Sequence, residues 1–372
     1  MRIRAAVLER VGATQPYATS RPLSIEDVQL DDPVRGELLV RIEAAGVCHS
    51  DLSVVDGTRP RPVPMVLGHE AAGVVEAVGD GIADVEAGDH VVLAFVPACG
   101  ACEACEAGRP ALCAPAAAAN AAGELLGGGS RLRRRSAPLH HHLGVSGFAE
   151  RAVVARSSAV VVDRDVPLET AALLGCATLT GAGAVLNSAA VQPGESVAVF
   201  GLGGVGLAAV MAAVAVGAAP VIAVDPVPGK RALACELGAT SAHDPVDAPA
   251  AIREETRGGV RYAFEAAGHP RVLEAAYAAT ERGGTTVSMG LPDPTLQLRL
   301  PALSLVAEAR TLVGSYMGSS VPQRDVPRFV ELWRSGRLPV ERLHSATVAL
   351  DEVNEAMDAL AAGEVVRQIV RP

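Results

Sequence analysis

The chain has 372 residues, of which 49% are hydrophobic and 3% aromatic, and its formal net charge is −10. This length suggests two domains, and an acidic chain with few aromatic side chains argues against nucleic acid as a partner, because a polyanion requires a basic surface. The first residues lack the apolar stretch of a signal peptide, and the apolar run 207–219 is too short to cross a bilayer. We therefore expect a cytoplasmic protein without membrane contact.

The pattern of the first part of the chain, up to about residue 155, predicts short strands and turns. Residues 91–93 and 152–155 have strand-like apolar patterns, and long helical patterns are scarce. Residues 115–135 lack periodicity, begin with alanines and end with four arginines. We interpret this segment as a long surface loop, which is either a solvated insertion or an element of substrate access or subunit contact.

From about residue 178 strands and helices alternate, which indicates a parallel sheet. The predicted strands are 196–200, 221–224, 262–264 and 285–289, and the predicted helices between or after them include 230–237 and 271–280. Helices at 325–335 and 350–361 and a strand at 366–370 follow. The fold class is therefore α/β, with a mostly-β part and a doubly wound part.

Four of the seven cysteines are clustered, with two, two and seven residues between them: Cys99, Cys102, Cys105 and Cys113. Four thiolates at this spacing can surround one zinc ion tetrahedrally and leave no open position, so the site would be structural. Free thiols or an iron–sulfur cluster are the alternatives. In a chain without a signal peptide, so many cysteines favour metal binding or catalysis over disulfides.

The remaining cysteines are Cys48, Cys176 and Cys235, and a Gly-His-Glu motif places His69 and Glu70 between the first two. Cys235 falls within a predicted helix and is interpreted as a small buried residue. A single Gly-His-Glu is a weak signal, because most histidines are not metal ligands.

A glycine-rich turn follows the predicted strand 196–200 and begins a helix. It fits GxGxxG with Gly201, Gly203 and Gly206, and Gly204 and Val205 lie inside it. Such a turn lets a pyrophosphate approach a helix N-terminus. Asp225 ends the next strand, where a carboxylate accepts ribose hydroxyls and repels a 2′-phosphate. NAD is therefore favoured over NADP, although Arg231 leaves room for both.

The order of Cys48-His-Ser-Asp51, Gly68-His-Glu70, the four-cysteine cluster, Cys176 and the glycine turn resembles zinc-dependent medium-chain alcohol dehydrogenases over essentially the whole chain. The segment before Leu139 resembles the long loop of the animal-type, commonly dimeric members. The resemblance implies a GroES-like catalytic domain at 1–177 and 320–372, and a Rossmann-type NAD-binding domain at 178–319.

The resemblance also implies residue roles at the catalytic zinc. Cys48, His69 and Cys176 would bind the metal, Glu70 would be the nearby carboxylate that can approach it, and Asp51 would orient the histidine ligand. Ser50 resembles the hydroxyl that begins the proton relay, and His49 resembles a cofactor-phosphate contact. Many relatives end the relay with a histidine where this chain has Ser53, which cannot act as a base near neutral pH.

Further residues are carried over for the cofactor and the substrate. Lys230 resembles a ribose contact, Thr180 and Val205 resemble nicotinamide contacts, and Arg367 resembles a phosphate contact or else is a plain surface arginine. The residues that would line the substrate pocket are Phe95, His142, Leu143, Leu291 and Tyr316. His142 would line a pocket that accepts a polar group, serve as the missing base, or face solvent from a loop. Arg59 would lie near the pocket mouth, where it would attract an anion.

The sequence thus predicts an enzyme with two zinc ions per chain that transfers hydride between an alcohol and NAD and gives an aldehyde or ketone. It would be a homodimer with a small-molecule substrate. One alternative is a thiol-dependent formaldehyde dehydrogenase, although residues 54–61 lack the acidic pattern that we associate with glutathione-dependent enzymes. The other is a non-catalytic nucleotide-binding relative on the same fold.

Overall fold

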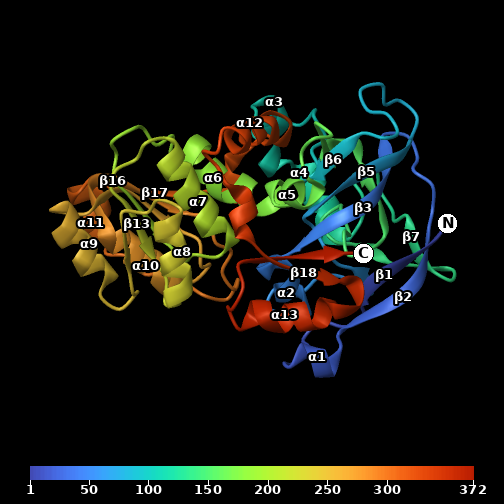
Figure 1. Cartoon of the computed structure of the whole chain (residues 1–372), viewed down its shortest axis with the longest axis horizontal. Coiled ribbons are helices and arrows are strands. Elements are labelled where there is room, and N and C mark those ends of the chain that lie inside the picture. Colours follow the sequence, from blue (N-terminus) through green and yellow to red (C-terminus); the bar gives the residue numbers. More distant parts are fainter. The chain divides into compact units, whose positions relative to one another are not determined.

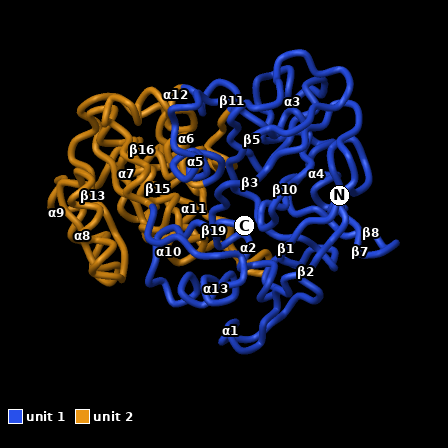
Figure 2. The backbone as a smooth tube through the Cα atoms, turned by 45° about the vertical axis from the view of Figure 1, so that its right-hand side comes forward, with its two compact units in different colours: residues 1–176, 321–327, 344–372 blue, residues 177–320, 328–343 orange.

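The computed structural model describes residues 1–372 as two compact units (Figure 2). Unit 1 comprises Met1–Cys176, Val321–Pro327 and His344–Pro372, and unit 2 comprises Ala177–Ser320 and Arg328–Leu343. The predicted boundaries assign residues 328–343 to the first domain, whereas here they group with unit 2. Their side chains explain this placement, because Arg342 forms an ion pair with Glu236 and Arg337 donates to the carbonyl of Ala215.

Unit 1 consists mainly of antiparallel strands in two sheets (Figure 1). The first sheet has the order β8 (Ala137–Pro138), β7 (Leu132–Arg134), β2 (Leu23–Leu30), β1 (Arg2–Leu8), β4 (Met65–Val66) and β9 (His140–His141). The second has the order β11 (Ala159–Val162), β6 (His90–Leu93), β5 (Ala71–Val78), β3 (Glu37–Val47), β19 (Arg367–Arg371) and β18 (His344–Ala349), and β10 (Arg151–Ala155) also pairs with β3. The predicted strands at 91–93 and 152–155 are confirmed as parts of β6 and β10.

Strand β3 is the element of unit 1 that positions the later site. Its eleven residues are almost entirely buried, and it pairs with β5, β10 and β19. Such a strand is held on both edges and packed on both faces, so its end is fixed in space. Cys48 follows β3 directly and begins helix α2 (His49–Val55). The other helices of unit 1 are α1 (Tyr17–Ser20), α3 (Glu103–Glu106), α4 (Ala114–Ala122), α5 (Leu168–Ala172) and α13 (Val353–Ala361).

Unit 2 contains one six-stranded sheet in which every neighbouring pair is parallel, which confirms the predicted βαβ organisation. Its order is β14 (Ser241–His243), β13 (Val221–Val224), β12 (Val197–Phe200), β15 (Val260–Glu265), β16 (Thr280–Ser288) and β17 (Thr311–Gly314). The helices that pack with this sheet are α7 (Gly204–Ala215), α8 (Pro228–Glu236), α9 (Ala248–Thr256) and α10 (Pro270–Ala279) (Figure 1). Helices α6 (Leu179–Gly183) and α11 (Ala302–Ala307) also belong to unit 2, and α12 (Pro322–Arg334) begins in unit 1 and ends in unit 2.

The segment 115–135, predicted as a long surface loop, contains most of α4 and all of β7, so that prediction is wrong for residues 115–122 and 132–134, whereas residues 123–131 form turns and loop. Its alanine-rich start forms α4, which ends at Gly123 in the left-handed conformation. Alanine has the highest helix propensity, but this helix is mostly exposed and therefore shows no amphipathic period. Three of the four arginines at its end form ion pairs: Arg131 with Glu37, Arg133 with Asp31 and Arg134 with Glu9. The segment therefore carries no free basic cluster.

The expectation that Cys235 is buried is wrong, and one apolar helical run was not anticipated. Cys235 lies in α8 as predicted but is exposed rather than buried, because it is on the outer face of an amphipathic helix. The helical run Leu168–Ser188 is long and apolar enough to span a membrane by length and composition, but 89% of its apolar window is buried inside the protein. Burial of that extent is typical of a core helix.

The turn between β12 and α7 depends on two glycines for different reasons. Gly201 has a φ of +90°, which other residues rarely adopt, and a β-carbon on Gly206 would lie 1.8 Å from the carbonyl oxygen of Gly201. Gly203 has an ordinary φ of −73°, and nothing lies within 4 Å of a β-carbon added there. The close approach of helix to strand therefore requires Gly206 and not Gly203.

We expect Gly206→Ala to lower the free energy of unfolding by about 3 kcal/mol, because the methyl group must force the turn apart. Gly203→Ala is the matched control and should remain within about 1 kcal/mol of wild type. Urea denaturation of both variants measures the difference. Equal stability of the two variants would show that the turn has room for a side chain at Gly206.

Candidate active site

The three cysteine and histidine residues expected at a catalytic metal come together in unit 1. Cys48 caps the N-terminus of α2, His69 lies in the connection between β4 and β5, and Cys176 lies in the π-helical turn Leu174–Thr178. Their ligand atoms and a carboxylate oxygen of Glu70 all lie within 4.8 Å of one another, and all four residues are buried. Two thiols and an imidazole at this separation can hold a zinc ion with one position left open.

The protonation of this cluster also suits a metal ion. A hydrogen bond with Cys176, together with the charges of Arg367 and His69, holds the pKa of the Cys48 thiol well below its usual range. The Nε2 atom of His69 lies 3.4 Å from the sulfur of Cys176, so this nitrogen is directed toward the thiols. The hydrogen bond with Cys48, together with burial, raises the pKa of the Cys176 thiol, so the pair holds one thiolate and one thiol. Binding of a divalent cation requires deprotonated ligands, so it would displace the remaining thiol proton.

Asp51 connects the two chain segments that carry these ligands. Its carboxylate accepts the backbone N–H groups of Cys48 and Gly68, each at 3.1 Å, and its Oδ1 lies 3.1 Å from Nδ1 of His69. Burial acts to raise the pKa of Asp51, but the charges and hydrogen bonds of His69 and His142 outweigh this effect and lower the pKa to about 2. The carboxylate is therefore charged, and it fixes the ring orientation of His69 with Nε2 as the available ligand atom.

Glu70 is a buried carboxyl group without a hydrogen-bond partner on either oxygen. Burial raises its pKa to about 7, although the charge of Arg367 opposes this shift. The space it occupies exists because residue 46 is glycine: a β-carbon on Gly46 would lie 2.4 Å from Oε1 of Glu70. Arg367 is the neighbouring cation, but neither carboxyl oxygen of Glu70 accepts a hydrogen bond. A buried carboxyl left without hydrogen bonds beside two thiols and an imidazole is a donor set that fits a zinc ion.

Arg367 was expected to contact cofactor phosphate or to lie on the surface. It is 3% exposed, which excludes a plain surface position. Its guanidinium donates to the carbonyl of Val47 at 3.0 Å, and its Nε lies 3.6 Å from Oε1 of Glu70. Strand β19 pairs with β3 and brings this arginine to the metal cluster. A contact with phosphate stays a prediction.

The residues of the expected proton relay lie on α2, where Arg59 joins them. Ser53 donates from Oγ to the carbonyl of Ser50 at 2.9 Å. Arg59 donates from Nε to Oγ of Ser53 at 3.1 Å and from its NH2 group to Oγ of Ser50 at 3.5 Å. His49, the next residue to Ser50, is exposed. The sequence placed Arg59 only near a pocket mouth and gave no sign of its contact with both serines.

Three of the expected substrate residues gather around His69. The ring of Phe95 lies edge-on to that of His69 at 5.5 Å, His142 lies edge-on on it at 5.4 Å, and Leu143 is buried beside His142. His142 is 1% exposed and its Nδ1 lies 3.1 Å from Oδ1 of Asp51, so the solvent-facing alternative is wrong. Leu291 and Tyr316 belong to unit 2, where they are 50% and 38% exposed.

Sequence reasoning missed Asn120, because it lies in the segment interpreted as a loop. From α4 the side-chain amide of Asn120 donates to the backbone carbonyl of Phe95 at 3.4 Å. The backbone carbonyl of Asn120 accepts from the guanidinium of Arg61 at 2.9 Å. Helix α4 thus supports the backbone beside Phe95. A single asparagine among alanines carries no pattern that could have revealed this role.

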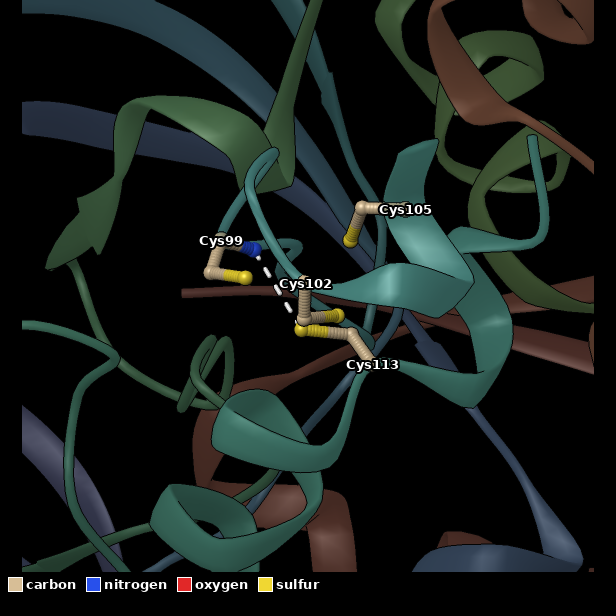
Figure 3. A group of neighbouring side chains, drawn as sticks. All are labelled: Cys99, Cys102, Cys105 and Cys113. Atoms are coloured by element: carbon tan, nitrogen blue, oxygen red, sulfur yellow. Dashed lines mark hydrogen bonds between the residues drawn. The ribbon is translucent and has the colours of Figure 1, made fainter. Parts of the chain in front are cut away.

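The four clustered cysteines form a second group of potential ligands (Figure 3). Their sulfur atoms lie within 4.8 Å of one another, and the backbone N–H of Cys99 donates to the sulfur of Cys113 at 3.3 Å. Gly100 and Gly108 adopt positive φ values, as the curling of the loop requires. All four are free thiols, so disulfides do not explain the cluster, and the arrangement fits one tetrahedral zinc ion.

The residues expected around the nucleotide lie together in unit 2. Asp225 ends β13 and accepts the N–H groups of Leu202 in the glycine turn at 2.7 Å and of Val227 at 2.8 Å. Arg231 donates to the carbonyls of Asp225 and Pro226 and forms an ion pair with Asp244. Thr180 and Val205 lie on α6 and α7, which pack closely, and Lys230 is half-buried on α8. Asp225 therefore presents a fixed carboxylate next to the turn.

Comparison with known proteins agrees with both the geometry and the motif order. The family described as "Alcohol dehydrogenase GroES-like domain" matches residues 34–164, and the family described as "Zinc-binding dehydrogenase" matches residues 204–335. Geraniol dehydrogenase of Castellaniella defragrans is 40% identical and covers 99% of this chain and 97% of its own. The chain belongs to the zinc-dependent medium-chain alcohol dehydrogenase family.

Solved structures of this family have the same fold over the full chain. An alcohol dehydrogenase zinc-binding domain protein from Burkholderia ambifaria has a TM-score of 0.94 at 42% identity, and benzyl alcohol dehydrogenase from Acinetobacter calcoaceticus has 0.93 at 34%. Each covers 100% of this chain and 99% of its own. A chain from Sinorhizobium meliloti bound to NADP has a TM-score of 0.82 at 27% identity and covers 100% of both chains. The fold expectation is confirmed, and the alcohol dehydrogenase acts with zinc and a nicotinamide cofactor.

We expect Asp51→Asn to weaken zinc binding at the cluster of Cys48, His69 and Cys176 by about 10- to 100-fold. An amide cannot accept from two backbone N–H groups and an imidazole N–H with the strength of a carboxylate. Competition with a chelator measures the affinity. Asp56→Asn, at the exposed end of the same helix, is the control and should leave affinity unchanged. Wild-type affinity in Asp51→Asn would contradict the connecting role of this carboxylate.

Proposed function

We propose that this alcohol dehydrogenase uses NAD and a zinc ion held by Cys48, His69 and Cys176 to convert an alcohol reversibly into an aldehyde or ketone. The observation that carries the proposal is the buried cluster of two thiols and an imidazole beside the carboxyl of Glu70, whose oxygens accept no hydrogen bond. A second zinc ion, bound by the four clustered cysteines, would have a structural role. The chain would then hold two zinc ions.

The residues of the candidate site would have separate roles in the proposed reaction. A bound zinc ion supplies Lewis acidity, which lowers the pKa of an alcohol coordinated to it. Asp51 fixes His69, and Ser50, two residues after Cys48, would accept the alcohol proton through its hydroxyl. Buried Phe95 and Leu143 would exclude water. Bound NAD would supply the hydride acceptor, and the overall reaction would convert the alcohol and NAD into the carbonyl compound, NADH and a proton.

We propose NAD rather than NADP because of the environment of Asp225. Its carboxylate is held at the end of β13 by two backbone N–H groups, where a 2′-phosphate would meet a fixed negative charge. Arg231, the nearby cation, is already bound to two carbonyls and to Asp244. It would have to give up these partners before it could neutralise a phosphate.

Primary allylic and benzylic alcohols are the proposed substrates. The support is the similarity to relatives that are named for geraniol and benzyl alcohol, together with the apolar side chains of Phe95 and Leu143 beside the metal cluster. His142 and Arg59 make the surroundings more polar than these two residues alone would.

We further propose a cytoplasmic homodimer. Strand β17 is at the edge of the sheet of unit 2 and pairs only with β16, so its outer backbone groups are available to a second copy. Next to it along the chain, α11 exposes Leu303 at 78% and Val306 at 84%. An exposed sheet edge with large apolar side chains is a liability in a monomer and is commonly covered by a second subunit.

The proposed activity predicts NADH formation from geraniol or benzyl alcohol, with NAD used at least about tenfold more efficiently than NADP, because the charge at Asp225 disfavours the phosphate. Absorbance of NADH follows the reaction. Parallel assays with formaldehyde and glutathione test the thiol-dependent alternative. Absence of turnover with every alcohol class, with and without thiols, would leave the non-catalytic alternative.

Metal analysis gives the control for the same proposal. Wild type and Cys235→Ala should each contain two zinc ions per chain and be active, since Cys235 is exposed and outside both clusters. Cys48→Ala should contain one zinc ion and be inactive. An unchanged zinc content in Cys48→Ala would contradict the assignment of the catalytic ligands.

The dimer proposal predicts a particle of twice the chain mass of 37.9 kDa in sedimentation equilibrium. Val306→Lys should shift the equilibrium toward the monomer, because a desolvated charge in an apolar contact is unfavourable. Val34→Lys, at another exposed valine in unit 1, serves as the control. A wild-type monomer, or a dimer unaffected by Val306→Lys, would exclude this surface as the interface.

A further inference from the structure

Arg59 folds back onto the helix that carries the proposed relay. Its backbone N–H donates to the carbonyl of Ser53 at 2.8 Å, and its side chain donates to Oγ of Ser53 at 3.1 Å and to Oγ of Ser50 at 3.5 Å. Ser50 and Ser53 are one helical turn apart, so one guanidinium can reach both hydroxyls. The charge of Arg59 is thereby placed on the same face of α2 as Ser50.

No acidic side chain neutralises this arginine. The nearest carboxylate along the chain, Asp56, instead accepts the backbone N–H of Thr58 at 2.8 Å. Arg59 forms no ion pair, in contrast to Arg131 and Arg133, which each hold a carboxylate. It is half-buried, so its field is screened less than that of a fully exposed arginine.

The same contacts prevent Ser53 from passing a proton from Ser50 to solvent along α2. Ser53 has committed its hydroxyl proton to the carbonyl of Ser50 and accepts from Arg59. Arginine stays protonated at any physiological pH and cannot accept a proton. The pair therefore cannot act as a relay end, and the position has a fixed charge in place of a titratable base.

We propose that Arg59 is a positioning residue that holds the Ser50 hydroxyl and makes its surroundings selective for a negatively charged ligand oxygen. The inference rests on the proposed function, in which Ser50 contacts the substrate oxygen. Arg59 would then lie two hydrogen bonds, about 6 Å, from that oxygen. With an effective dielectric constant of about 40, between that of water and that of a protein surface, a unit charge at this distance favours an anionic ligand over a neutral one of the same shape by about tenfold.

Benzoate and benzamide provide the matched probes, since they share shape and differ in charge. Their dissociation constants are measured by calorimetry on the zinc-loaded enzyme with bound NAD. For Arg59→Gln we expect benzoate binding to weaken about tenfold, equivalent to about 1.4 kcal/mol, and benzamide binding to change less than about twofold. Arg59→Lys, which keeps the charge, should retain benzoate affinity to within about threefold.

Arg35→Gln controls for the loss of any surface cation. Arg35 is exposed and precedes β3, whereas Cys48 follows the other end of this strand, about 36 Å away for eleven residues. It should change neither constant. Equal weakening of both ligands in Arg59→Gln would show a merely structural role and overturn the proposal, as would unchanged benzoate affinity. Turnover of alcohols by wild type with either result would leave the proposed function standing. If wild type oxidises no alcohol and binds neither probe, the proposed function fails as well.

Discussion

The candidate site depends on one buried carboxylate. Asp51 accepts from the N-terminus of α2 and from the turn that carries His69, and it orients the imidazole itself. A buried charge is tolerated only when it is paired and hydrogen-bonded, and Asp51 meets both conditions while also lying in the first turn of a helix, where negative charge is favourable. Strand β3 fixes the start of α2, and the hydrogen bonds of Asp51 connect this helix to His69. The position of His69 is therefore fixed relative to the sheet.

The contacts of Glu70 and Arg367 in the cluster depend on the pairing of distant segments. Strand β19 lies antiparallel to β3, and this pairing brings Arg367 beside Val47 and Glu70. Gly46 leaves the space into which Glu70 fits. Cys48, Glu70 and Arg367 therefore come from segments that are remote in sequence and are brought together by the pairing of β3 with β5 and β19. Removal of these charged groups from water is compensated only when the attraction among them, and to a bound cation, is strong.

The sequence could predict the elements with strong local patterns. The apolar runs of β12 and β13 and the glycine turn indicated the parallel sheet, and the order of the cysteine and histidine motifs indicated the family. The sequence could not reveal α4, because exposed alanines have no period, or the exposed side of Cys235, because α8 is short. It also could not show that Arg367 turns inward, since that depends on which strand β19 pairs with. Contacts of this kind are set by tertiary pairing and leave no local signal.

The surroundings of Ser50 show how a site can keep its metal ligands while its electrostatics differ. A histidine at the end of a relay changes charge near neutral pH, so its influence on the bound oxygen depends on pH. Arg59 is charged throughout that range, and burial keeps the pKa of His142 low, although Asp51 opposes this shift. The charge that Arg59 places next to Ser50 is therefore constant where a relay histidine would titrate. A constant positive charge stabilises a bound anion at every pH at which the enzyme is folded, and the proton must leave by a route other than Ser53.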